Sequence, residues 1–368
     1  MHRITRRSAL SSAAGVALMS PVFAAVRDMK FSKATAILEQ SVSSGQVRAA
    51  AIFVQSGEMQ LSASFGDAKT PDAAFLLGSI SKPIAMTALM TLFGQGKFDL
   101  DDAAQKYLPE FQGGNRDKVT VRHLLTHTSG LPDQLPQNAE LRSKHATLAD
   151  FVQGALEVPL HFEPGTKYEY SSMAILLAAE IAQRLSGVEI KKLVDQTVLQ
   201  PLGMNHSALG VGQLATDQMM QCQVEFGAVE SGGGSEDSKN WDWNSSFWRK
   251  LGAPWGGLQA SATDVGKFLH SFLHPTGTLF KPEVGNLMIR NHNAVGLESR
   301  GLGFDVGMES SCPGCSPSSF GHTGSTGTIA WADPVRDLIC VVLTTLPAGA
   351  LPVGKHPRQL ASDCIASA

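Results

Sequence analysis

Residues 76–84 read LLGSISKPI and place Ser79 three positions before Lys82, where a loop turns into a helix. From Ser79 to Phe93 the residues are mostly good helix formers, and two glycines then end the run. Because residues i and i+3 share one helix face, the Lys82 amine can lie against the Ser79 hydroxyl. Free N–H groups at a helix start favour negative charge, which suits an activated nucleophile facing an oxyanion. The alternative is an N-cap serine beside a solvated lysine, and the tetrapeptide alone favours it.

Length and charge set broad limits on the kind of protein. The chain has 368 residues, 43% hydrophobic content and a formal net charge of −3. It is long enough for one large domain or two moderate ones. A near-balanced charge gives no reason to expect nucleic acid or an anionic membrane as a partner.

The first 24 residues are predicted to be an export signal. Arginines precede an apolar stretch from Ala9 to Met19, and Val22-Phe23-Ala24 offers small residues for cleavage. Thr5-Arg6-Arg7 resembles a twin-arginine signal, with a Sec signal or an uncleaved helix as alternatives. No later stretch has ~18 uninterrupted apolar residues, so no membrane span is expected. We expect a periplasmic or secreted protein.

The order of the expected elements predicts an α/β (α+β) protein. A helix at 28–44 and a hairpin at 49–55 and 59–65 come first, and strands at 302–308, 319–333 and 338–345 with a helix at 356–366 come last. Residues 97–273 are mostly helical by pattern. We therefore expect an antiparallel sheet flanked by helices (25–95 and 276–368) and a large inserted all-helical domain (96–275).

A loop rich in Gly, Ser and charge runs from 226 to 257 and holds four of the five tryptophans. A loop of this length inside a compact domain is usually functional or mobile. It is interpreted as a lid or rim with aromatic contacts, and plain surface packing is the alternative.

A second candidate site lies at residues 164–172, PGTKYEYSS. Tyr170 falls just before an apolar helix that starts near Met173 and can point its hydroxyl into a cleft. Near a lysine ammonium the phenol pKa of ~10 would fall, which would suit a proton shuttle. A tyrosine that bridges core and surface is the alternative.

A third candidate site lies at residues 320–328, FGHTGSTGT. Glycines at 321, 324 and 327 let another backbone or a substrate approach a strand closely. Such an edge can pair with an ester or amide and offer a backbone N–H to the oxyanion. A bulge or tight bend is the alternative.

The three stretches, in this order, resemble the serine β-lactamase and penicillin-binding superfamily. The likeness is strongest to the branch of class C β-lactamases, D-alanyl-D-alanine carboxypeptidases and esterases, and it covers most of the chain after the signal. It implies a β-lactamase/transpeptidase-like fold. Supporting segments are FDLDD (98–102), YLP (107–109), HLLTHTSGL (123–131), GGL (256–258) and ASATD (260–264).

The resemblance implies a role for each catalytic residue. Ser79 would be the nucleophile, Lys82 its base or base-tuner, and Tyr170 the proton shuttle. The backbone N–H groups of Ser79 and Ser325 would form the oxyanion hole. The expected substrate is a small molecule or peptide with an ester or amide carbonyl, and no cofactor is implied.

The resemblance also implies that Ser172, His322, Thr323 and Gly324 bind substrate. Ser172 stands where β-lactamases of this branch usually have Asn, and His322 stands in place of the lysine of strong β-lactamases. Both departures fit esterase-like members better. His322, with an ordinary pKa near ~6.5, would bind a carboxylate only when protonated, which predicts weaker activity on such substrates above neutral pH. A penicillin- or peptide-binding protein with little turnover is the alternative.

Two other motifs point to metal or redox chemistry. His123 and His127 have the i, i+4 spacing of a zinc site, but Leu124 stands where the zincin pattern needs Glu, so no metal site is predicted. Cys312-Pro313-Gly314-Cys315 lies in a loop between strands, which favours a local disulfide over a thioredoxin-like redox site. With five cysteines, at least one thiol stays unpaired in a monomer.

Overall fold

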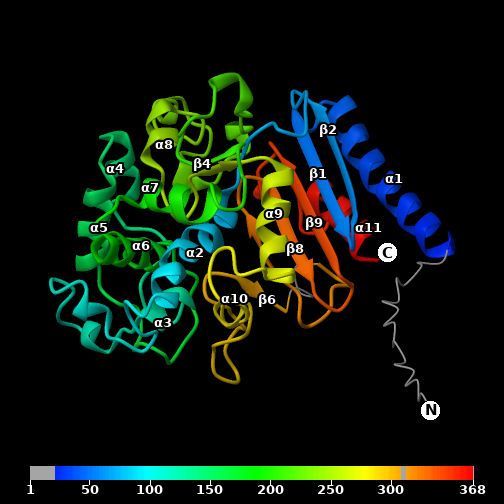
Figure 1. The fold of residues 1–368 in the computed structure, drawn as a ribbon. Coiled ribbons are helices and arrows are strands. Elements are labelled where there is room, and N and C mark those ends of the chain that lie inside the picture. Colours follow the sequence, from blue (N-terminus) through cyan, green and yellow to red (C-terminus); the bar gives the residue numbers. More distant parts are fainter. Residues whose placement is uncertain (1–20, 308–311, 368) are drawn as a thin grey trace, which may run out of the picture.

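The computed structural model describes residues 21–307 and 312–367 and is built on one antiparallel sheet of six strands (Figure 1). The strand order is β2-β1-β9-β8-β7-β6, so β1 and β9, which come from opposite ends of the chain, are neighbours inside the sheet. The strands are β1 (Ala49–Ser56), β2 (Met59–Gly66), β6 (Asp305–Val306), β7 (Phe320–Gly324), β8 (Thr328–Asp333) and β9 (Leu338–Thr344).

Helices cover both faces of this sheet. α1 (Pro21–Ser43) and α11 (Pro357–Ala366) pack together on one face, and α9 (Ala262–Leu273) packs on β1, β8 and β9 from the other. Alternate residues of β1 therefore belong to two different hydrophobic clusters, which explains why the strand is apolar without a polar face.

The other helices form the part of the molecule that lies beside the sheet (Figure 1). Its central element is α2, in which every residue from Ser81 to Leu92 is buried, against α6 and α7. The helices are α2 (Ser81–Gly94), α3 (Val121–Leu125), α4 (Asn138–Ser143), α5 (Leu148–Glu157), α6 (Ser172–Ser186), α7 (Ile190–Val194), α8 (Ser246–Leu251) and α10 (Pro282–Met288).

A second, small sheet was not predicted. It consists of β3 (Phe75–Leu76), β5 (Leu258–Ala260) and β4 (Ser207–Leu209), paired in that order. Strands of two or three residues are too short to show an alternating pattern. This sheet matters for function because it brings the end of the Trp-rich loop beside the Ser79 stretch, where the Leu77 N–H donates to the Leu258 carbonyl at 2.9 Å.

The predicted fold class is confirmed, and the differences are local. The strand expected at 302–308 covers only Asp305–Val306, and the strand expected at 319–333 is two strands joined by a turn. The division into domains stays a prediction, and α9, which it assigns to the helical part, lies on the sheet. The export signal predicted at 1–24 lies outside the described residues, apart from 21–24 in α1. Among the described residues no helix has the length and apolar character needed to cross a membrane.

The disulfide expected between Cys312 and Cys315 is absent from the structure, where both are free thiols. They lie in the hydrophobic cluster under α11, and the Cys312 Sγ is 3.4 Å from the Ser362 hydroxyl. A hydrogen bond with Cys315 lowers the pKa of the Cys312 thiol. The two cysteines therefore pack as thiols against the last helix, α11.

Substitution of Gly266 by alanine should destabilise the protein. A Cβ at this position of α9 would lie 2.3 Å from the Phe53 ring of β1, so helix and sheet would have to move apart. Overpacking of this kind costs about 1–3 kcal/mol. Urea denaturation of Gly266→Ala should show that loss. Gly349→Ala, where a Cβ meets open space, is the control, and equal stability of both variants would contradict the close packing.

Candidate active site

Ser79 lies on a short 3-10 turn, Gly78–Ile80, which leads into α2. The Lys82 amine, one turn further on, lies 3.0 Å from the Ser79 hydroxyl and donates to the Trp255 carbonyl at 3.0 Å. Lys82 is 1% exposed. The structure thus brings the predicted nucleophile and base into direct contact, and a neutral amine at this distance can take the hydroxyl proton.

The environment of Lys82 favours its neutral form. Burial lowers the pKa of the Lys82 amine from 10.5 to about 7, and Arg300 contributes in the same direction. The carboxylates of Asp133 and Glu230 oppose this shift. An amine with a pKa near 7 is about half deprotonated at neutral pH, so it can act as a general base where an ordinary lysine could not.

Tyr170 lies over the same lysine but differs from its prediction in one respect. Its ring centroid is 4.6 Å from the Lys82 amine, which places the predicted shuttle beside the predicted base. Burial is the dominant effect and raises the pKa of the Tyr170 phenol above its ordinary value, so the expected lowering by a lysine ammonium is wrong. Ser79 is close enough to lower the phenol pKa slightly, yet no described residue gives the hydroxyl a well-formed hydrogen bond. Tyr170 therefore keeps its proton in the resting protein.

His127, dismissed as a zinc ligand, holds Tyr170 in place. Its carbonyl accepts the Glu169 N–H at 3.0 Å and its Nδ1 accepts the Ser171 N–H at 3.1 Å. Its ring lies 4.6 Å from the Tyr170 ring. Burial lowers the pKa of His127 well below its ordinary value, so the imidazole is neutral. Residues 21–307 and 312–367 contain no His, Cys, Asp and Glu cluster suited to a metal ion, and His127 is a positioning residue.

His322 is neutral, which overturns the expected pH dependence. Its Nδ1 must donate to the Thr323 carbonyl at 2.6 Å, and its Nε2 must accept from Arg300 at 2.6 Å, because a carbonyl cannot donate and a guanidinium cannot accept. Burial and the Arg300 charge hold the pKa of His322 well below its ordinary range. It cannot become the imidazolium that the carboxylate hypothesis requires near neutral pH.

Arg300, the hydrogen-bond partner of His322, is a site residue that the sequence did not reveal. It is 3% exposed, forms an ion pair with Asp305 of β6, and its guanidinium lies 5.3 Å from the Tyr170 ring. It precedes β6 by a few residues in a loop that carries no recognisable motif. Only the pairing of β6 with β7 brings it beside His322.

The glycines of β7 allow other backbone segments of the same protein to approach this strand closely. A Cβ at Gly324 would lie 2.2 Å from both the Leu77 carbonyl oxygen and the Thr328 hydroxyl. The hydroxyls of Thr326 and Thr328 donate to the carbonyls of Leu76 and Leu77 at 2.6 and 2.7 Å. These contacts clamp the Ser79 turn to the sheet.

Gly78 allows the same close approach from the Ser79 side. It adopts a φ of +56°, and a Cβ there would lie 3.2 Å from the Ser325 nitrogen. The backbone of Ser325 is thus next to the nucleophile turn, which is where an oxyanion donor is needed. Ser325 itself is exposed and Thr323 is half-buried.

Two cavities flank the nucleophile, and Ser79, Tyr170 and Ser325 line both of them. The outer cleft has a volume of about 510 Å³ and the inner cavity about 120 Å³. His322 and Thr323 line the outer cleft, whereas Lys82 and Ser172 line the inner cavity. The N–H and hydroxyl of Ser172 both donate to the Asp133 carboxylate, at 2.9 and 2.6 Å. Its hydroxyl is therefore already engaged before any substrate binds.

The tryptophans of the Trp-rich loop form an inner wall, although the first part of the loop, which includes Phe226 and Val229, is exposed. All four of its tryptophans are buried, and Trp243, Trp248 and Trp255 line the inner cavity. The segment is built from 3-10 turns and α8. Plain surface packing is therefore wrong for the tryptophans, and three of the four face the site.

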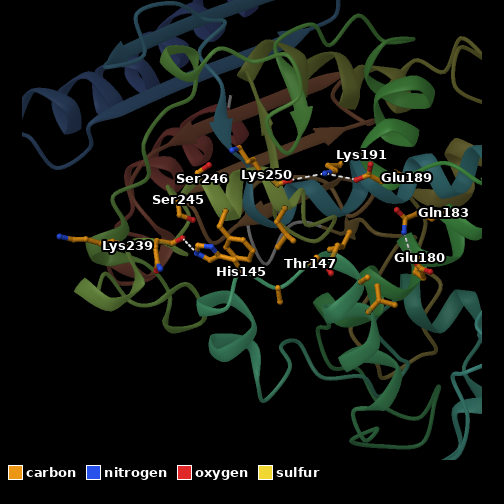
Figure 2. Close-up of a pocket in the computed structure, with 17 residues that line it drawn as sticks. His145, Thr147, Glu180, Gln183, Glu189, Lys191, Lys239, Ser245, Ser246 and Lys250 are labelled. Carbon is orange, nitrogen blue, oxygen red and sulfur yellow. Dashed lines mark hydrogen bonds and ion pairs between the residues drawn. The ribbon is translucent and has the colours of Figure 1, made fainter.

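A larger hollow of about 860 Å³ lies elsewhere, between α5, α6, α7 and α8 (Figure 2). His145, Lys191, Lys239 and Lys250 are among its lining residues. None of the predicted site residues lines it. The volume of a cavity therefore does not identify the active site in this protein, whereas the contact of Ser79 with Lys82 does.

Comparison with known proteins agrees with the fold. Residues 34–363 match the family model "Beta-lactamase". "Protein flp" of Staphylococcus aureus (strain COL) is 28% identical over 183 residues, which make up 47% of this chain. The match spans only 37% of the length of Protein flp. A putative D-alanyl-D-alanine carboxypeptidase of Salmonella agona (strain SL483) is 25% identical over 320 residues, 76% of this chain and 70% of the relative.

Among solved structures, EstCE1, described as a hydrolase with promiscuous acyltransferase activity, superposes with a TM-score of 0.73. The superposition covers 93% of this chain and all of that one at 20% identity, which shows a shared fold. The architecture of this chain is therefore the β-lactamase fold. The match over residues 34–363 is decisive, and the chain belongs to the beta-lactamase family.

The pH profile of the site should follow Lys82. Because the amine must be neutral to accept a proton and its pKa is about 7, kcat/KM should rise with pH below about 7 and level off above it. Hydrolysis of p-nitrophenyl acetate from pH 5 to 9 measures this. A decline between pH 7 and 8 would contradict the role of Lys82 as the titrating base.

Replacement of His127 should separate positioning from stability. His127→Asn keeps an acceptor for the Ser171 N–H and tolerates the φ of +60°, so thermal stability should change little. The His127 ring packs on the Tyr170 ring, which lies over Lys82, so its loss should loosen this cover and weaken the desolvation of Lys82. Both a lower kcat and a shift of the acid limb to higher pH should follow. His123→Gln, which keeps the cap of α3, is the control. An unchanged kcat and pH profile in His127→Asn would contradict the positioning role.

Proposed function

We propose that the protein is an exported serine hydrolase that forms an acyl-enzyme on Ser79 and hydrolyses an ester or amide. The observation that carries this proposal is the contact of Ser79 with Lys82, whose pKa of about 7 makes it a base at neutral pH. Export rests on the signal expected at residues 1–24.

The mechanism follows from the positions of the side chains. Neutral Lys82 takes the Ser79 proton as the serine oxygen attacks the carbonyl carbon. The N–H groups of Ser79 and Ser325 hold the oxyanion, each worth ~3 kcal/mol of the barrier. The proton then reaches the leaving group through the phenol of Tyr170, which gives up its own proton as it receives one from Lys82. Water, activated by the same two groups, completes hydrolysis of the acyl-enzyme.

The charges of the outer cleft favour an uncharged substrate. Arg300 is neutralised by Asp305, His322 is neutral, and Glu298 adds a negative charge at the cleft. No free cation of the described cleft lining remains to hold a carboxylate. A neutral ester therefore fits better than a D-alanyl-D-alanine peptide, which ends in a carboxylate. A β-lactam is disfavoured for the same reason.

Labelling of Ser79 tests the proposal. The wild-type protein should react with a fluorophosphonate at Ser79, and its turnover of p-nitrophenyl acetate should fall at least ~10³-fold in Ser79→Ala. Mass spectrometry locates the adduct, and Ser143→Ala, an exposed serine of α4, is the control. A folded wild-type protein that gives neither adduct nor turnover would be a binding protein, and the proposal would fail. Faster release of D-alanine from a D-alanyl-D-alanine peptide than of p-nitrophenol would overturn the choice of substrate.

A further inference from the structure

The inner cavity beside Ser79 contains an unusual number of unsatisfied polar atoms. Among the described residues that line it, four buried side-chain atoms have no hydrogen-bond partner. They are Arg142 Nη1, Trp248 Nε1, Gln134 Oε1 and Tyr170 Oη. A buried polar atom without a partner costs about 1–3 kcal/mol, so a cluster of them indicates a site that a ligand completes.

Arg142 is the most informative member of this cluster, because a guanidinium is rarely buried without a carboxylate. It is 1% exposed, its Nε donates to the Asn138 side chain at 3.2 Å, and its guanidinium lies 4.0 Å from the Trp248 ring centroid. The Asn138 amide in turn donates to the Glu230 carbonyl at 3.0 Å. Burial lowers the pKa of Arg142 only to about 10, so it stays charged at neutral pH. The side chain is held rigidly while its Nη1 remains free.

The donors and charges of the cavity define what it would accept. Arg142 Nη1 and Trp248 Nε1 can only donate, so the occupant must offer an oxygen acceptor. Asp133 and Glu230 line the same cavity, and their carboxylates repel an occupant that carries a negative charge. A neutral oxygen, such as a ketone or amide carbonyl, meets both conditions.

The two cavities also differ in how they are closed. Most residues of the inner cavity are buried, whereas the outer cleft also includes the exposed Glu298 and Ser299, which the inner cavity lacks. A leaving group must depart to solvent, which the outer cleft permits. The acyl group stays on Ser79 until water attacks, which suits the enclosed side. The volume of about 120 Å³ limits that group to a short one.

We propose that the inner cavity is the acyl subsite and that Arg142 and Trp248 select short acyl groups carrying a neutral oxygen acceptor. The inference rests on the proposed acyl-enzyme at Ser79 and adds the class of acyl group to it. Arg142 and Trp248 are then specificity-determining residues supplied by α4 and α8.

A matched pair of esters tests the inference. The 4-oxopentanoyl and 4-methylpentanoyl esters of p-nitrophenol differ in one position, where a carbonyl oxygen replaces a methyl group of similar size. The wild-type protein should prefer the 4-oxopentanoyl ester in kcat/KM by about tenfold or more, since a hydrogen bond to a charged group is worth that much. Arg142→Met should abolish most of this preference, and Trp248→Phe should reduce it.

The ratio of the two rates is independent of how much protein folds correctly, and titration with a fluorophosphonate counts the competent sites. Lys144→Met, an exposed residue at the end of α4, is the matched control and should keep the wild-type ratio. If Arg142→Met does not fold, Arg142→Lys and Trp248→Phe still report on the donors.

Three results would overturn the inference. An equal rate for the two esters in the wild-type protein would do so, as would a preference that survives in both Arg142→Met and Trp248→Phe. A preference that follows the leaving group when phenyl and ethyl esters are compared would assign the cavity to the other side of the scissile bond. If Ser79 is acylated but the two esters react equally fast, only this inference fails. If no Ser79 adduct forms at all, the proposed function fails as well.

Discussion

The burial of one lysine governs the site. Lys82 lies at the start of a helix that is buried on all sides, and its amine meets only the Ser79 hydroxyl and the Trp255 carbonyl as hydrogen-bond partners within 3.5 Å among the described residues. Taking an ammonium out of water is expensive, so the group gives up its proton more easily. The packing that stabilises the helix is therefore the same packing that prepares the base. Stability and reactivity have one physical origin here.

Two parts of the chain that are far apart in sequence hold this arrangement. The β7–β8 turn clamps the Ser79 loop through two threonine hydroxyls, and it can do so because Gly324 and Gly78 carry no Cβ. On the other side the small sheet β3-β5-β4 brings Trp255 to the lysine. The nucleophile turn is thus compressed between a sheet and a tryptophan-lined wall, which leaves little freedom to its geometry.

Neutralisation of charge is the second theme of the cleft. His322, Arg300 and Asp305 form a connected group in which the imidazole is neutral and the guanidinium is paired. His127 is neutral for the same reason of burial. An outer cleft without an unpaired charge at these residues suits neutral substrates. Arg142 of the inner cavity differs, because its guanidinium has a nitrogen without a hydrogen-bond partner.

The sequence by itself determined the fold class and the long helices, because periodicity is a local property, and its resemblance to a known family pointed to Ser79, Lys82 and Tyr170 as the site. It could not determine the protonation states of Tyr170 and His322, which depend on burial and on Arg300, a residue 22 positions from His322 in the chain. Nor could it reveal the roles of His127 and Arg142. Desolvation and convergence of distant side chains exist only in the folded molecule, so only the tertiary structure decided which groups carry charge and which cavity faces the nucleophile.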